Sequence, residues 1–275
     1  MRPGTVRRWF VAAAVPLLLL AAAGCLAAGC SADDVGNLGT VTGSGTPATK
    51  TFGYTGFTGL RVDSAFRAEV TRGDAFAVSV TVDDNIVQHL RVEVDGDTLR
   101  IGLEPGYAYV GATLSATVTM PSITALEVTG AAKADVSGFA AGDPLDLQAS
   151  GDGSVALTGA RTGDVNLDVS GAADVSGDLA AKQLGGNVSG AGEVTLTGSA
   201  EALALEASGA GKLELSGLTA QLADLQLSGG ATATVRVTGK LDVEASGGAT
   251  LDYYGSPTLG TVDVSGGAEV NRAGP

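Results

Sequence analysis

The chain has 275 residues, including 42 glycines, with 44% hydrophobic and 4% aromatic residues and a formal net charge of −14. The glycines follow no Gly-X-Y period, which excludes collagen, and the aliphatic content is too high for a disordered chain. Only 16 Lys and Arg stand against 30 Asp and Glu, so the clustered positive charge that neutralises phosphates is missing. We therefore expect no nucleic-acid partner.

Residues 1–30 have the pattern of a bacterial export signal. Arg2, Arg7 and Arg8 give a positively charged start, and an almost wholly apolar run over residues 9–23 follows. No later stretch approaches the roughly 18 apolar residues that are needed to span a bilayer. We therefore predict an exported protein.

Both cysteines stand at the end of the apolar run, each after Ala-Ala-Gly. Small residues followed by Cys resemble the bacterial lipobox, in which the signal is cut before a cysteine that carries lipid. Cys30 is the favoured lipidation site because the polar residues 31–34 follow it, and Cys25 is the alternative. A secretory signal that discards both cysteines is also considered. Lipidation at Cys30 predicts a lipoprotein anchored to the bacterial cell membrane and facing outward, with no thiol left for catalysis or metal binding.

Residues 31–48 are small and polar and show no hydrophobic period. We predict a flexible tether here, which as a Gly/Ser-rich coil would reach on the order of 25 Å. Such a reach holds a domain clear of the lipid headgroups.

Residues 49–120 contain alternating runs that predict strands near residues 60–70, 76–82, 90–94, 99–103 and 114–120. These runs have no common spacing. Asp95-Gly96-Asp97 lies between two of them and predicts a tight hairpin turn. Most of the aromatic residues lie here, so we expect irregular N-terminal β coils that begin and cap the fold.

A repeat of about twenty residues dominates residues 121–275. Apolar and polar residues alternate before each unit's Ser/Thr-Gly pair, which indicates strands with one buried face. A twenty-residue unit is too short for a βαβ crossover, which takes about thirty residues. We predict an all-β fold, a parallel β-helix or solenoid that is continuous over 49–275. The eight pairs begin at Thr129, Ser150, Ser170, Ser189, Ser208, Ser228, Ser246 and Ser265.

The polar residue two positions before each Ser/Thr is a carboxylate or an amide every time. Stacked in register, carboxylates about 4.8 Å apart repel by roughly 1 kcal/mol in water. An intervening amide doubles that separation and can donate hydrogen bonds to both sides. We interpret the set as a structural polar ladder, made of Glu127, Gln148, Asp168, Asn187, Glu206, Gln226, Glu244 and Asp263.

A line of oxygen ligands for Ca²⁺ is the alternative interpretation of the ladder. Glu244 and Asp263 are its best candidates, with Asp242 nearby. No other cofactor is expected. At the C-terminal end, Arg272 takes an inward position, and an inward charge hinders pairing at an open sheet edge.

The lipobox, the first coil Gly56-Phe57-Thr58-Gly59-Leu60-Arg61-Val62 and the serial Leu-x-Val-x-Ser-Gly-Ala/Gly units resemble a known family. It is called putative auto-transporter adhesin, head GIN domain, and the resemblance covers about residues 50–274. The resemblance implies a right-handed β-helix on the cell surface and supplies no catalytic residues.

These observations favour a non-enzymatic cell-surface lipoprotein, an adhesin-like or scaffold module that binds a glycan or protein partner. The alternative is a carbohydrate-active β-helix enzyme, a polysaccharide lyase or hydrolase, which needs converging carboxylates with bases or sugar platforms in one groove. Tyr253 and Tyr254 are expected to face inward and outward. His89 is interpreted as a lone surface or turn residue, and residues 83–85 as a turn with a Ca²⁺ site as the alternative.

Overall fold

The structure is a computed structural model that describes residues 39–140 and 142–274. The predicted signal peptide over 1–30, both candidate lipidation sites Cys25 and Cys30, and residues 31–38 of the predicted tether lie outside the described residues. Within the described part, no helix has the length and apolar character needed to cross a membrane.

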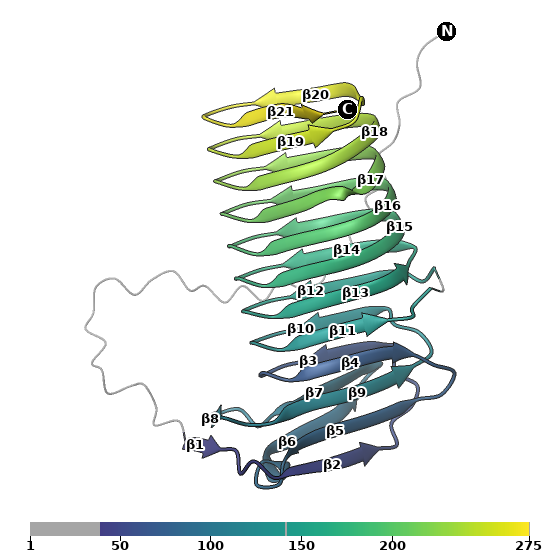
Figure 1. Ribbon diagram of the computed structural model, residues 1–275, viewed down its shortest axis with the longest axis vertical. Helices are drawn as coiled ribbons and strands as arrows, with labels where there is room; N and C mark the ends of the chain where they lie inside the picture. Colours follow the sequence, from purple (N-terminus) through teal and green to yellow (C-terminus); the bar gives the residue numbers. More distant parts are fainter. Residues whose placement is uncertain (1–38, 141, 275) are drawn as a thin grey trace, which may run out of the picture. The chain divides into compact units, whose positions relative to one another are not determined.

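Parallel strands stack in two columns that face each other across the core (Figure 1). The first column consists of β7 (Thr98–Leu103), β3 (Gly59–Val62), β10 (Ala125–Val128), β12 (Leu145–Ala149), β14 (Asp164–Val169), the second halves of β15 to β18, and β20 (Thr258–Val264). The second consists of β9 (Leu114–Met120), β4 (Arg67–Arg72), β11 (Lys133–Ser137), β13 (Ser154–Arg161), the first halves of β15 to β18, β19 (Thr250–Tyr254) and β21 (Glu269–Gly274).

Four long strands bend between the two columns and so belong to both. They are β15 (Asp174–Val188), β16 (Glu193–Ala207), β17 (Lys212–Leu227) and β18 (Thr232–Ala245). The result is a β-solenoid of about seven turns with coils of roughly 20 residues, which confirms the predicted fold class.

The alternation of apolar and polar residues explains why the core is narrow and continuous. Leu203, Leu205 and Ala207 point inward from β16 and are at most 2% exposed, while the residues between them face solvent. Val, Leu and Ala at the same positions of neighbouring coils stack upon one another. Burial of these aliphatic rows is the main favourable contribution to the stability of the coils.

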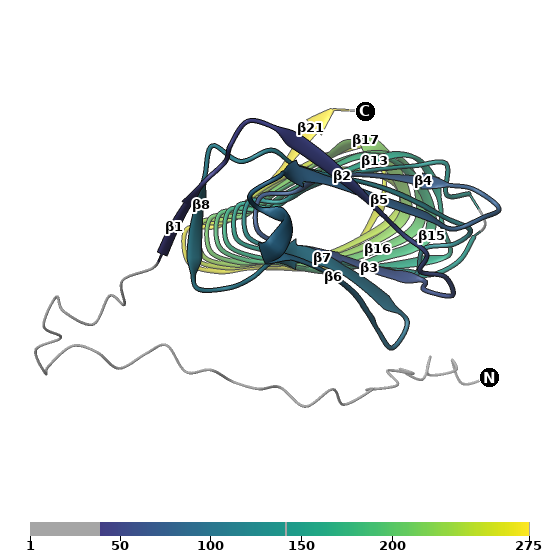
Figure 2. The same cartoon turned by 90° about the horizontal axis from the view of Figure 1, so that it is seen from below.

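Antiparallel strands close the N-terminal end of the solenoid (Figure 2). β6 (Leu90–Asp95) pairs with β7, while β5 (Ala77–Asp83) pairs with β9 and with β2 (Pro47–Phe52). The hairpin predicted at Asp95-Gly96-Asp97 is confirmed, with Asp95 opposite Thr98 and Gly96 at φ 62°. Phe57 and Phe66 are fully buried in this region, which forms the predicted irregular cap.

The tether predicted over 31–48 is wrong for residues 39–48. β1 (Gly39–Thr42) forms a two-stranded parallel sheet with β8 (Tyr107–Val110), and β2 begins at Pro47. The strands are short and mostly exposed, so their hydrophobic pattern is weak. Pairing partners distant in sequence supply the hydrogen bonds that make this polar segment extended.

Candidate functional site

The register of the first column places the ladder side chains in one line. Each residue pairs with its counterpart in the next coil, through Glu127↔Gln148, Gln148↔Asp168, Asp168↔Asn187, Asn187↔Glu206, Glu206↔Gln226, Gln226↔Glu244 and Glu244↔Asp263. All of them point outward because they alternate with buried aliphatic residues along the strands.

Two arginines extend this line at its N-terminal end. Arg61 is in register with Glu127 and with Arg100, and its Nη1 lies 3.0 Å from Glu127 Oε1. Arg100 Nη2 lies 3.0 Å from Asp95 Oδ2. The twenty-residue repeat did not reveal this extension, because Arg61 and Arg100 belong to the irregular coils.

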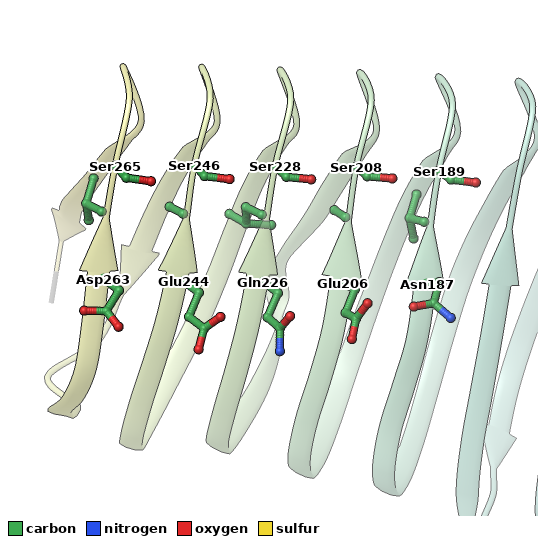
Figure 3. Close-up of a pocket in the computed structure, with 15 residues that line it drawn as sticks. Asn187, Ser189, Glu206, Ser208, Gln226, Ser228, Glu244, Ser246, Asp263 and Ser265 are labelled. Atoms are coloured by element: carbon green, nitrogen blue, oxygen red, sulfur yellow. The ribbon is translucent and has the colours of Figure 1, made fainter. Parts of the chain in front are cut away.

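A row of serines runs beside the ladder, where each strand of the first column ends and the chain turns (Figure 3). The Ser208 amide donates to the Val188 carbonyl at 2.9 Å, and the Ser228 amide donates to the Ala207 carbonyl at the same distance. These coil-to-coil hydrogen bonds repeat, so the hydroxyl groups have the spacing of the coils. The row consists of Ser189, Ser208, Ser228, Ser246 and Ser265.

The serines and the C-terminal part of the ladder together line a groove of about 630 Å³, which we call the serine–acid groove. Its acid wall carries Asn187, Glu206, Gln226, Glu244 and Asp263, and no Lys or Arg lines it. Figure 3 shows the hydroxyl groups in one row and the carboxyl and amide groups in the other. Each coil therefore contributes one hydroxyl and one carboxyl or amide group.

Most polar side chains of the groove make no hydrogen bond within the described part of the protein, so they are available to a ligand. Among the described residues, the acid wall makes no side-chain hydrogen bond or ion pair, and in the serine row only Ser189 bonds through its hydroxyl, to the Val169 carbonyl at 3.5 Å. The hydrogen bonds expected between amides and neighbouring carboxylates are therefore not formed. The amides still separate the charges, because Gln226 stands between Glu206 and Glu244.

The candidate calcium ligands are brought only partly together. Glu244 and Asp263 are adjacent in the groove, whereas Asp242 is bound elsewhere. Lys240 Nζ lies 2.6 Å from Asp242 Oδ2, the Thr261 amide donates to Asp242 Oδ1 at 2.7 Å, and these two contacts lower the pKa of Asp242. Over residues 39–140 and 142–274, no group of three or more His, Cys, Asp or Glu side chains is arranged to hold a metal ion. Calcium binding stays a prediction.

His89 lies in the short 3₁₀ turn η1 (Val87–His89), but it is not alone. Its Nδ1 is 3.1 Å from Glu104 Oε2, and its ring centroid is 4.7 Å from that of Tyr107 and 5.7 Å from that of Tyr109. Burial raises the pKa of Tyr109, and the Glu104 carboxylate adds to the rise. Sequence reasoning missed this cluster because its members come from separate elements at the N-terminal cap.

The acidic turn at residues 83–85 anchors the first strands. Asp84 accepts a hydrogen bond from the Ser44 hydroxyl at 2.6 Å, and the Asn85 amide donates to the Thr42 carbonyl at 2.8 Å. Asp83 is fully buried, and its Oδ2 accepts the Thr113 amide at 3.4 Å. These contacts support the interpretation as a turn.

Two adjacent tyrosines face opposite sides of β19. Tyr253 is 9% exposed and faces the core, whereas the Arg236 guanidinium lies 5.2 Å from the ring centroid of the outward Tyr254. The prediction that Tyr253 faces inward and Tyr254 outward is therefore confirmed.

Comparison with known proteins supports the architecture. The family model described as putative auto-transporter adhesin, head GIN domain, matches residues 56–257. No curated protein matches the chain.

Solved structures share the fold at low sequence identity. A putative adhesin from Parabacteroides merdae is 20% identical with a TM-score of 0.78, covering 85% of this chain and 98% of its own. A putative adhesin from Parabacteroides distasonis is 23% identical with a TM-score of 0.78, covering 85% and 100%. A putative lipid binding protein from the same species is 20% identical with a TM-score of 0.76, covering 84% and 98%.

The family model spans most of the solenoid, including its first coil and nearly all of the repeat whose register forms the groove. The chain therefore belongs to the family of putative auto-transporter adhesins with a head GIN domain.

Proposed function

We propose that this protein is a non-enzymatic, adhesin-like lipoprotein of the cell surface that binds an extended neutral or amino-bearing glycan chain in the serine–acid groove. The family and the neighbouring structures described as adhesins support the non-enzymatic, adhesin-like role. In this proposal, lipid on Cys30 anchors the protein to the outer side of the bacterial membrane.

The observation that carries the proposal is the constant donor and acceptor pattern of the groove. Five coils each present a hydroxyl group beside a carboxyl or amide group on the same strand, and successive coils are about 4.8 Å apart. Serine hydroxyls and amides both donate and accept hydrogen bonds, and carboxylates accept them. A polysaccharide also repeats its hydroxyl groups along its length, so each coil can contact one stretch of the chain.

The negative charge of the groove determines which classes of glycan it favours. Glu206, Glu244 and Asp263 give the groove negative charge, and no basic side chain lines it. Uronic-acid and sulfated chains are repelled, whereas neutral chains are accepted and amino sugars are attracted. The groove walls also lack aromatic rings, so affinity builds from many weak polar contacts and should increase with chain length.

The experiment measures binding of the chain from residue 31 onward to neutral, amino-bearing and acidic oligosaccharides of increasing length. We expect binding to the first two classes, strengthening with length until five coils are spanned. The double variant Ser208→Ala and Ser228→Ala should weaken it about tenfold or more. The control Ser176→Ala lies on the exposed face of the other column and should not change it.

Binding that is confined to acidic glycans, or that is unchanged in the groove variant, would contradict the proposal. The enzymatic alternative has its own readout, the release of new reducing or unsaturated ends from the same glycans. Glycoside hydrolysis needs two carboxyl groups flanking the scissile bond. The carboxylates of the groove stand in a single row on one face of the sheet, beside the serines, so the geometry does not favour that alternative.

The anchor is tested by metabolic labelling with a radioactive or clickable fatty acid. We expect label on the wild type and on Cys25→Ser, and loss of label on Cys30→Ser. Label that persists on Cys30→Ser and disappears on Cys25→Ser would assign the anchor to the alternative cysteine.

A further inference from the structure

The acid wall of the groove has a fixed order of charged and neutral positions (Figure 3). Its carboxylates are Glu206, Glu244 and Asp263, and its amides are Asn187 and Gln226. The register places Gln226 between Glu206 and Glu244. Asp263 follows Glu244 directly. At about 4.8 Å per coil, the strands that carry the first two carboxylates are about 10 Å apart, and those that carry the last two are about 5 Å apart.

The three carboxylates of the wall have no cation of the protein beside them. None of the ion pairs within residues 39–140 and 142–274 includes a residue of the groove. On the second column, by contrast, Lys212 Nζ lies 3.0 Å from Glu193 Oε1 and 3.4 Å from Glu214 Oε1. An exposed carboxylate without such a partner can form a charge-assisted hydrogen bond with an ammonium group of a ligand.

Two further acidic side chains lie near the wall but outside the groove. Asp224 and Asp242 stand two residues before the wall positions of their coils, on the side away from the serines, and they do not line the groove. Asp242 is paired with Lys240, whose Nζ lies 2.6 Å from its Oδ2. The order of charges along the groove is therefore set by the wall residues themselves.

Each carboxylate of the wall acts mainly on the ligand group in its own coil. At physiological ionic strength, salt screens exposed charges that are separated by more than about 8 Å, so Glu206 and Glu244 act almost independently. A charge-assisted hydrogen bond is roughly twice as strong as a neutral one. An ammonium group therefore gains more beside a carboxylate than beside Gln226, whereas the Gln226 amide can both donate to and accept from a neutral sugar.

We propose that the serine–acid groove recognises the positions of amino groups along a glycan, with one sugar per coil. This inference rests on the proposed function, in which the groove binds a neutral or amino-bearing glycan. An extended β-(1→4)-linked chain advances by nearly one coil spacing per sugar, so it can follow the coils in register. Glu206 and Glu244 then bind amino groups on alternate sugars, with a neutral sugar at Gln226. Glu244 and Asp263 bind amino groups on adjacent sugars.

The test uses two isomeric ligands of equal charge. Both are β-(1→4)-linked glucosamine oligosaccharides with two free amino groups and all other amino groups acetylated; the free groups lie on alternate sugars in one isomer and on adjacent sugars in the other. Asp263→Asn leaves only the spacing of Glu206 and Glu244, so the alternate isomer should bind about fivefold or more tightly than the adjacent one. Glu206→Gln leaves only the spacing of Glu244 and Asp263, so the preference should reverse.

The two variants are matched to each other. Each removes one negative charge and places an amide at a wall position, where other coils already carry an amide. Calorimetric titration of the chain from residue 31 onward, which contains the whole compact unit that begins at Gly39, gives the dissociation constants. The wild type contains both spacings and should bind both isomers with similar affinity. The control Asp174→Asn removes the same charge from an exposed place on the second column and should behave like the wild type.

The possible outcomes separate this inference from the function on which it rests. Ligands that bind without a reversal of preference between Asp263→Asn and Glu206→Gln would overturn the inference and leave the proposed function in place. A wild type that binds neither isomer and no neutral oligosaccharide would overturn both.

Discussion

A column of glycines makes each turn of the solenoid possible. Gly247 has φ 74°, and a Cβ on it would lie 2.8 Å from the Gly229 carbonyl oxygen of the coil below. The same approach recurs along the column, at Gly151, Gly171, Gly190, Gly209, Gly229 and Gly266. Positive φ and close stacking of backbone on backbone both require glycine, so the recurrence of Ser/Thr-Gly has a steric cause.

Two neighbouring glycines provide a matched test of this requirement. Gly247→Ala should lower the free energy of unfolding by about 1–3 kcal/mol, since it adds strain at positive φ and a steric clash. Gly248→Ala should be nearly neutral, because its Cβ would lie 3.6 Å from its nearest neighbour and alanine already fills this place at Ala210. Denaturant unfolding of both variants gives the comparison, and equal losses would contradict the steric explanation.

Each strand residue pairs in register with one residue of the next coil, and these pairs link the coils to one another. The acid wall alternates charged and neutral groups up to Gln226, while Glu244 and Asp263 are adjacent carboxylates. Because these side chains make no hydrogen bonds to one another, charge spacing rather than amide bridging explains the alternation.

Gln226→Glu should therefore destabilise the solenoid, since it creates a run of four carboxylates from Glu206 to Asp263. Each new neighbour contributes roughly 1 kcal/mol of repulsion in water, and salt screens it. Thermal unfolding at low and high salt measures the effect, with Gln226→Met as the uncharged control. A loss of stability that is equal in both variants and independent of salt would refute the charge explanation.

A second element-scale contact joins β18 to β20 through Asp242, which binds Lys240 and the Thr261 amide. These partners lower the pKa of Asp242 below the ordinary value of 3.8. A lowered folded pKa contributes stability above the unfolded pKa, and this contribution is lost as pH falls through the folded pKa.

The melting temperature should therefore be higher for the wild type than for Asp242→Asn at neutral pH, and the difference should shrink as the pH falls below 3.8. Thermal scans of both proteins across this pH range check the sign. A difference that is constant with pH would show that the Asp242 charge plays no part.

At the scale of the whole folded unit, the N-terminal residues decide how the solenoid begins. β3 and β4 form the first coil in sequence order. β7 and β9 come later in the sequence, yet they lie beneath that coil. β2 and β5 then cover that lower coil, and β1 pairs with β8. The cap is therefore assembled from segments that are not consecutive.

This arrangement predicts that residues 39–48 contribute to stability. A chain that begins at residue 49 loses β1 and the start of β2, and with them the partners of Asp84 and Asn85. Its free energy of unfolding should be lower by about 1 kcal/mol or more than that of a chain beginning at residue 31. Beginning at residue 39 should have little effect, and equal stability of all three chains would show that the first strands are dispensable.

The sequence by itself determined the repetitive half of this protein. From Thr124 onward, alternation defines the buried face and the Ser/Thr-Gly spacing defines the coil, so the ladder residues and their order could be predicted. The reason is physical, because each coil contacts mainly its two neighbours and a local pattern carries the information.

Only the tertiary structure decided the rest. It brought His89 to Glu104 and Tyr107, and it joined β1 to β8. Both features depend on contacts between segments without a shared period. The apolar–polar alternation of a single strand does not predict such contacts, because pairing between distant segments overrides local propensity there.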